Sequence, residues 1–139
     1  MLEFDLINAG RLYTRCFHER YRQLNLTHCR VLLALAQNQG MTQSALGRLI
    51  AFDSVALGRI LDNLEASRWI KRQAYPGDRR AHSLVITAEA RELLPALWSV
   101  VAELERDALL GVSAGEKQIL MSALQRMLGN LRQCAGALE

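Results

Sequence analysis

The sequence predicts a mainly α fold of the α+β class, with about six helices and one small β-hairpin. Apolar residues recur at helical spacing over most of the 139 residues, and only 2 prolines are present to interrupt helices. Residues 70–87 differ, because they read as two short strands joined by a turn. With 50% hydrophobic residues the chain can bury a core, and we expect one domain over residues 1–139.

Two helices are expected at the start of the chain. Apolar residues at three- to five-residue spacing predict the first from Phe4 to about Gln23. Thr27 is a suitable N-cap for the second, because a threonine hydroxyl can accept a hydrogen bond from the first turn. Gly40 is expected to stop that helix. Its apolar residues are Val31, Leu32, Leu35 and Ala36.

Two short helices follow, each after a capping residue. Thr42 precedes the third helix, and Asp53 precedes the fourth. The expected inner residues of the third helix are Ala45, Leu46, Leu49 and Ile50. Those of the fourth are Leu57, Ile60, Leu61 and Leu64. Two short helices followed by a hairpin are the parts of a winged helix-turn-helix.

The hairpin is predicted between Ile70 and Thr87. Proline fixes the first corner of a turn at Pro76, and glycine accepts the positive φ of a type II second corner at Gly77. A basic tip could enter a DNA minor groove or pair with phosphate oxygens, although alone it also fits a solvated turn. The tip arginines are Arg79 and Arg80.

The exposed side of the fourth helix is small or polar in its first turns. Ser54, Val55 and Gly58 would let the helix approach base edges closely. Arg59 could reach N7 and O6 of a guanine, or a phosphate. Alone, this helix could also be an ordinary amphipathic helix with a solvated face.

Positive charge is concentrated in the same part of the chain. Residues 59–80 contain six basic and three acidic side chains, a surplus equal to the net charge of +3 for the whole chain. Residues 83–139 contain five basic and seven acidic side chains. A field concentrated on one segment is typical of a nucleic-acid-binding surface.

The last third is predicted to contain two long helices. Thr87 is placed to cap the first, and Ser113 and Glu116 have capping-box spacing before the second. Wide apolar stripes on these helices need a partner surface, which favours a two-fold dimer over the alternative of a monomeric bundle. We therefore expect dimerisation helices at residues 1–25 and 88–139, around a DNA-binding lobe at residues 27–87.

Several classes of protein are disfavoured. The cysteines lack the spacing of a metal site, so we expect reduced thiols, no metal and no cofactor; they are Cys16, Cys29 and Cys134. No apolar run is long enough to span a bilayer, and no signal peptide is evident, so we expect a cytoplasmic protein with no membrane partner. An enzyme is disfavoured because the chain has no glycine-rich cofactor loop or paired catalytic acids.

These motifs resemble those of the MarR/SlyA family of bacterial regulators, over nearly the whole chain. The resemblance is carried by Leu26-Thr27, by residues 42–46, by residues 53–65 and by residues 77–87. Its most specific part is Asp78-Arg79-Arg80 before a hydrophobic-x-hydrophobic-Thr strand, together with Arg59. The resemblance implies an obligate, triangular homodimer joined by its first, fifth and sixth helices.

The resemblance also implies roles for individual residues. Asp78 would orient Arg80 for entry into the minor groove, which reduces the cost in rotamer entropy on binding. The expected DNA-contacting residues are Thr42, Gln43, Ser54, Val55, Gly58, Arg59, Arg79 and Arg80. One departure is Arg68, which stands where the family usually has glycine, so that the helix either takes a left-handed cap there or ends differently.

Family members commonly bind small phenolic or aromatic-acid effectors near the junction of the dimer helices and the DNA-binding lobe. Basic and aromatic residues could supply such a site, although basic residues on a terminal helix are usually solvated. The candidates are Arg11, Arg15, His18, Tyr21, Arg22 and His28. Another branch senses peroxides through a cysteine on the first helix, where Cys16 lies.

The resulting hypothesis is a homodimeric transcriptional repressor that binds a short inverted repeat in double-stranded DNA. The recognition helix, at about residues 53–67, would enter the major groove, and the wing, at residues 75–81, the minor groove. A small aromatic acid would release it. The alternatives are a cysteine-based redox sensor of the same fold and a winged module that binds protein instead of DNA.

Overall fold

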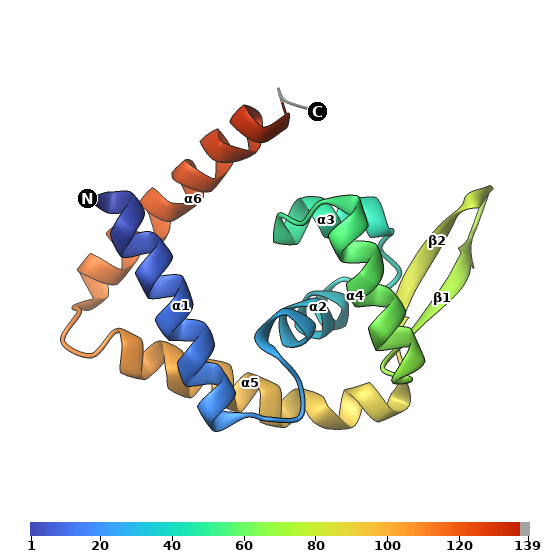
Figure 1. Cartoon of the computed structure of the whole chain (residues 1–139), viewed down its shortest axis with the longest axis horizontal. Coiled ribbons are helices and arrows are strands. Elements are labelled where there is room, and N and C mark those ends of the chain that lie inside the picture. Colours follow the sequence, from blue (N-terminus) through green and yellow to red (C-terminus); the bar gives the residue numbers. More distant parts are fainter. Residues whose placement is uncertain (137–139) are drawn as a thin grey trace. The chain divides into compact units, whose positions relative to one another are not determined.

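A computed structural model describes residues 1–136, and these form six helices and one antiparallel two-stranded hairpin (Figure 1). The mainly α fold with a small wing is confirmed. The elements in chain order are α1 (Leu2–Arg20), α2 (Leu26–Gln37), α3 (Gln43–Ile50), α4 (Ser54–Ala66), β1 (Ile70–Tyr75), β2 (Asp78–Ile86), α5 (Ala88–Ala108) and α6 (Ala114–Gly136).

The chain divides into two compact units, Met1–Leu104 and Glu105–Glu139. The core of the first unit is built around α2, whose residues from Val31 to Leu35 are all buried. The helices α3 and α4 and the hairpin contribute Leu46, Leu57 and Leu84 to it. Five consecutive residues occupy every side of a helix, so this stretch of α2 is the part on which the neighbouring helices and the hairpin pack.

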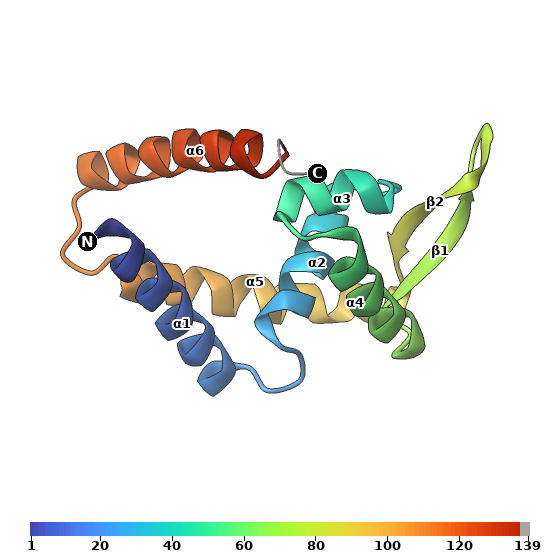
Figure 2. The same ribbon diagram turned by 45° about the horizontal axis from the view of Figure 1, so that its top comes forward.

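The hairpin pairs Ile70 with Ile86 and continues in regular register to Ala74 and His82. An irregularity follows, and Gly77 then takes the positive φ of +85° that was expected at the turn. The segment before α3 pairs with β2, because Leu84 donates its N–H to Met41 and accepts one from Gly40. Figure 2 shows the hairpin extending beyond α3 and α4.

Two of the predicted helix boundaries were wrong. The first helix ends at Arg20 rather than near Gln23, because Tyr21 has an extended backbone. Asn25, and not Thr27, caps α2: its side chain accepts the N–H of His28 at 2.8 Å. Asparagine is at least as good an N-cap as threonine, and it stands one residue before the first helical residue.

The other predicted caps are confirmed. Thr42 accepts the N–H of Ala45, and Asp53 accepts that of Ala56. Thr87 accepts the N–H of Ala90 and donates its hydroxyl to the carbonyl of Arg68 at 2.7 Å, which ties α5 to the end of α4. Thr87 is nearly buried, so this hydroxyl satisfies two backbone groups away from water.

Two smaller predictions differ from the structure. Leu49 was expected on the inner side of α3 but is exposed in the chain. An eight-residue helix contacts the core through one row, and in α3 that row is Leu46 and Ile50. The expected stop at Gly40 lies in the turn after α2, whose last helical residue is Gln37.

Arg68 adopts the left-handed conformation, with φ +62°. The N–H of Arg68 bonds to the carbonyl of Glu65, and the N–H of Trp69 bonds to that of Leu64. These two bonds form a Schellman motif, in which the left-handed position favours glycine. Of the two expected alternatives, the helix therefore takes the left-handed cap, with an arginine in the strained position.

The second unit contains the end of α5 and all of α6. The predicted capping box is confirmed, because Ser113 and Glu116 exchange backbone and side-chain hydrogen bonds. This contact lowers the pKa of Glu116, since the carboxylate accepts the N–H of Ser113. None of the described residues of α6 is buried, although large apolar side chains project from it, among them Ile119, Leu120, Met121 and Leu131.

Candidate nucleic-acid interface

The solvent-exposed face of α4 has few long side chains in its first turns. Its buried stripe is Leu57, Leu61 and Leu64, so the face on the other side is free to meet a partner. Ser54, Val55 and Arg59 are exposed on that face, while Gly58 is half-buried. The first two turns therefore carry a serine, an exposed valine, a glycine and one long cation, as predicted for a helix that approaches base edges.

Close packing fixes the angle between α3 and α4. A side chain at Gly47 would place its Cβ 3.2 Å from the carbonyl oxygen of Phe52 and 3.4 Å from Leu57, so glycine allows the close approach. Gln43 donates its side-chain amide to the carbonyl of Ser54 at 3.3 Å. Gln43 thus holds the corner of the helix-turn-helix, a role that sequence reasoning did not give it.

The same amide lies beside Gly58. A Cβ at Gly58 would lie 3.6 Å from Nε2 of Gln43, an ordinary van der Waals distance. The packing of α3 against α4 therefore does not require glycine at position 58, and Gly58 leaves the helix face open. The residues predicted to face DNA from these helices belong to one rigid corner.

The wing carries the predicted arginines at its tip. Arg79 and Arg80 are exposed on β2, directly after the turn at Pro76 and Gly77. The contact between Asp78 and Arg80 runs through the backbone: Oδ1 of Asp78 accepts the N–H of Arg80 at 2.9 Å. Asp78 thus fixes the main chain from which the Arg80 side chain starts.

A groove of about 250 Å³ lies between the start of α3 and the wing. It brings Thr42 and Gln43 together with Asp78 and Arg80, residues that are far apart in the sequence. Two further basic residues, Arg72 and His82, also line it and were missed. The period-2 alternation of a strand could have found His82, because it lies two residues after Arg80 on the same face.

Residues 22–81, which contain the helix-turn-helix and most of the wing, match the model of a family described as the MarR family. Over these residues the chain is similar to the MarR family. Members of this family are transcriptional regulators, and this chain has the fold of a DNA-binding regulator. The part of the chain that makes the match is the part that carries the candidate interface.

Several solved structures resemble this chain over nearly its whole length. A probable transcriptional regulator from Pseudomonas aeruginosa is 26% identical, with a TM-score of 0.81 over 91% of this chain and 96% of that one. A mutant MarR from E. coli, complexed with operator DNA, is 21% identical, with a TM-score of 0.83 over 91% and 93%. A MarR protein from Peptoclostridium difficile is 14% identical and has a TM-score of 0.92 over 99% and 92%. At these low identities, the similarity to the last two structures shows the fold alone.

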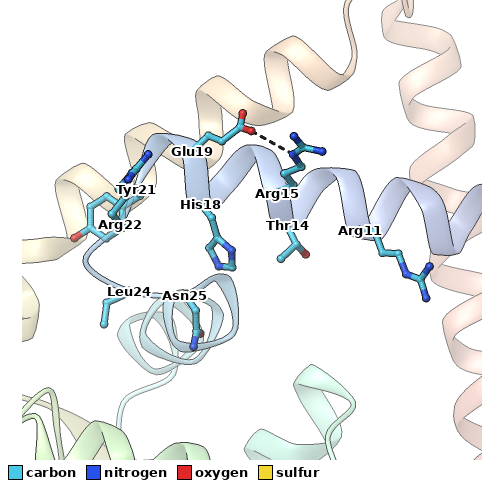
Figure 3. A pocket seen from close by; sticks show the side chains of 9 residues that line it. All are labelled: Arg11, Thr14, Arg15, His18, Glu19, Tyr21, Arg22, Leu24 and Asn25. Atoms are coloured by element: carbon cyan, nitrogen blue, oxygen red, sulfur yellow. Dashed lines mark hydrogen bonds and ion pairs between the residues drawn. The ribbon is translucent and has the colours of Figure 1, made fainter.

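A second cavity, of about 640 Å³, lies along α1 and the loop that follows it (Figure 3). Five of the six predicted effector-binding residues line it, and His28 does not. The remaining lining residues are Thr14, Glu19, Leu24 and Asn25. His28 lies on α2, where partial burial lowers its pKa and so favours the neutral imidazole.

The cavity is lined by cationic side chains, and one of them is already paired with a carboxylate that also lines it. Arg15 contacts Glu19 at 3.3 Å, and Figure 3 shows this pair pointing away from His18. Nε2 of His18 accepts the N–H of Leu26 at 3.3 Å, so this face of the imidazole is occupied. The pKa of Tyr21 is raised by burial and then by Cys29, so its hydroxyl stays neutral and donates to Gln23. Within the described residues 1–136, no carboxylate is paired with Arg11 or Arg22.

The cysteines occupy three different environments. Cys29 is fully buried, and burial raises its pKa to about 11, so at neutral pH it is a thiol of low reactivity. Cys16 is half-buried against the core, and Cys134 is exposed on α6.

Within residues 1–136, no cluster of three or more His, Cys, Asp or Glu side chains is arranged to hold a metal ion. In the same range, no helix has the length and hydropathy needed to cross a membrane.

Proposed function

We propose that this protein is a homodimeric MarR-family repressor that binds a short inverted repeat in double-stranded DNA. In this proposal residues 53–67 lie in the major groove, and the wing, residues 75–81, reaches the adjacent minor groove. The observation that carries it is the rigid corner of α3 and α4, whose exposed face presents Arg59 while the wing tip presents Arg79 and Arg80. Two cationic contacts on one compact unit match two neighbouring grooves of a duplex.

The homodimer is supported by apolar side chains that the single chain leaves uncovered. Ile119 on α6 is 71% exposed, and α1 leaves Leu2, Phe4, Ile7 and Leu12 exposed. Monomeric proteins rarely expose so many large apolar side chains on two helices, and a second copy would bury them. Residues 1–25 and 88–139 therefore form the dimerisation region in this proposal, and residues 27–87 form the DNA-binding lobe. A two-fold dimer presents two such lobes, which is why the site is an inverted repeat.

Selection of duplexes from a random-sequence pool tests this docking. The purified protein should enrich two inverted half-sites whose centres lie about one helical turn apart. Sedimentation should show two chains per particle. The variant Ile119→Glu should weaken the dimer and the selection together, because it places a charge in the apolar interface, whereas Gln118→Glu serves as a control of equal charge change. Enrichment of single half-sites by a monomer would contradict the proposal.

The cavity along α1 supports release of the repressor by a small aromatic or phenolic acid. Arg11, Arg22 and Thr14 line it beside the apolar side chain of Leu24, which suits a carboxylate attached to a ring. 4-Hydroxybenzoate should displace the protein from the selected duplex, whereas 4-hydroxybenzyl alcohol, which lacks the carboxylate, should not. Arg11→Gln should weaken this response and leave DNA binding intact. Equal displacement by both compounds would contradict a carboxylate-binding site.

In this proposal the protein acts in the cytoplasm, on chromosomal DNA.

A further inference from the structure

Val55 is a large apolar side chain in an unusual place. It is 65% exposed, on the first turn of α4, between the capping residue Asp53 and the half-buried Gly58. Burial does not account for it, since the core stripe of this helix begins at Leu57. Helix propensity does not account for it either, because β-branched residues lose χ1 freedom in a helix.

The neighbours of Val55 leave its methyl groups open. Residues three and four positions later lie on the same helix face, and these are Gly58 and Arg59. Gly58 has no side chain that could cover Val55. The amide of Gln43 is held against the carbonyl of Ser54, so the backbone under Val55 is fixed to α3. Val55 is therefore an exposed apolar side chain on a fixed backbone, in the first turn of the recognition helix.

The same face becomes polar further along the helix, where its acidic residue is paired with an arginine. Asp62 lies one turn after Gly58, and its carboxylate contacts Nη2 of Arg72 at 2.9 Å. A carboxylate held by an arginine repels phosphates less than an unpaired one. The row from Val55 to Asp62 thus offers an apolar contact first and a cation second, and its one acid is paired with Arg72.

The major groove of DNA displays one apolar group, the 5-methyl group of thymine. We propose that Val55 reads that methyl group, and that each half-site carries a thymine at the position the first turn of α4 meets. The inference rests on the proposed docking of α4 in the major groove. It assigns Arg59 and Val55 different tasks: Arg59 donates hydrogen bonds, while Val55 distinguishes thymine from cytosine by an apolar contact.

Replacement of thymine by deoxyuridine tests the inference, because it removes only the methyl group. The probe is the duplex selected from the random pool, synthesised with deoxyuridine at one thymine of a half-site at a time. Binding of the unmodified protein should weaken about fourfold at one position, the change expected for one buried methyl group. Val55→Ala should bind the unmodified duplex more weakly and should be insensitive to that replacement. Its melting temperature should stay unchanged or rise, since alanine is the better helix former.

Arg59→Ala separates the failure of this inference from the failure of the proposed function. If Arg59→Ala weakens binding while no deoxyuridine changes the affinity of the unmodified protein, the docking stands and the role of Val55 is overturned. Equal sensitivity of Val55→Ala and the unmodified protein to the replacement also overturns it, as does a selected half-site without thymine. If neither Arg59→Ala nor Val55→Ala changes binding, the docking itself is wrong.

Discussion

Arg72 on β1 holds Glu65 on α4 through two groups at once: its Nη1 contacts Oε1 at 3.0 Å, and its backbone N–H donates to Oε2 at 3.3 Å. The second guanidinium nitrogen of Arg72 contacts Asp62 at 2.9 Å. The wing is therefore joined to the recognition helix by one planar side chain that bridges two carboxylates. Such a bridge sets the spacing between the two proposed DNA contacts.

Replacing Arg72 with methionine should affect DNA binding more than folding. The carboxylates are partly exposed, so the free energy of unfolding should fall by about 1 kcal/mol. DNA affinity should fall further, because Asp62 and Glu65 would then face phosphates unpaired and the wing would no longer be tied to α4. Thermal unfolding and binding titrations of the same preparation measure both effects.

The matched control for that change is Arg91→Met, which removes the same charge from an exposed position on α5. It should change DNA affinity little. Adding Asp62→Asn and Glu65→Gln to Arg72→Met should recover part of the affinity by removing the repulsion. An equal fall in affinity for Arg72→Met and Arg91→Met would mean that only net charge matters.

Glycine at position 68 should stabilise the protein. Arg68 has φ +62° in the Schellman cap of α4, a conformation that disfavours any residue with a Cβ by about 1 kcal/mol or more. The flexibility of glycine in the unfolded chain offsets part of the gain, so Arg68→Gly should add about 0.5 kcal/mol. Chemical denaturation measures it. Arg68→Ala keeps the Cβ and removes the charge, and an equal gain in that variant would show that the backbone strain is not the cause.

Stability should fall as the pH rises through the titration of Cys29. Burial raises the pKa of this thiol from 9.0 to about 11, so the folded state retains a proton that the unfolded state has released. The contribution is fully present below pH 9 and disappears between about pH 9 and pH 11, by about 2–3 kcal/mol. The difference between the unmodified protein and Cys29→Ala across this range isolates it from other titrating groups. Parallel pH profiles for the two proteins would contradict the shift.

Local chemistry in the sequence was enough to predict most of the fold. Thr42, Asp53 and Thr87 cap the helices expected of them, because an N-cap needs only a side-chain oxygen and a free N–H within three residues. The turn at Gly77 follows from one residue's tolerance of positive φ. The end of α1 at Arg20 was missed, because its apolar spacing continues into Tyr21, which packs against the core from an extended backbone.

The candidate interface was less completely predicted, because its geometry depends on interactions between distant residues. Arg59, Arg79 and Arg80 could be proposed from residue type and position. The hydrogen bond from Gln43 to Ser54 and the bridge from Arg72 to α4 require the packed structure, since no spacing rule relates a helix start to a later carbonyl. The close approach at Gly47 was missed for the same reason.

The salt dependence of binding tests the central claim, that α4 and the wing bind DNA, most directly. For the duplex selected from the pool, the logarithm of affinity should fall linearly and steeply with the logarithm of salt concentration, because each neutralised phosphate releases counterions. Arg80→Ala should make that slope shallower by about 1 for each phosphate that the variant no longer neutralises, and Arg59→Ala should cost about 1–3 kcal/mol and relax sequence preference. A winged module that binds protein would give no such dependence on a duplex. A shallow slope that neither variant changes would contradict the claim.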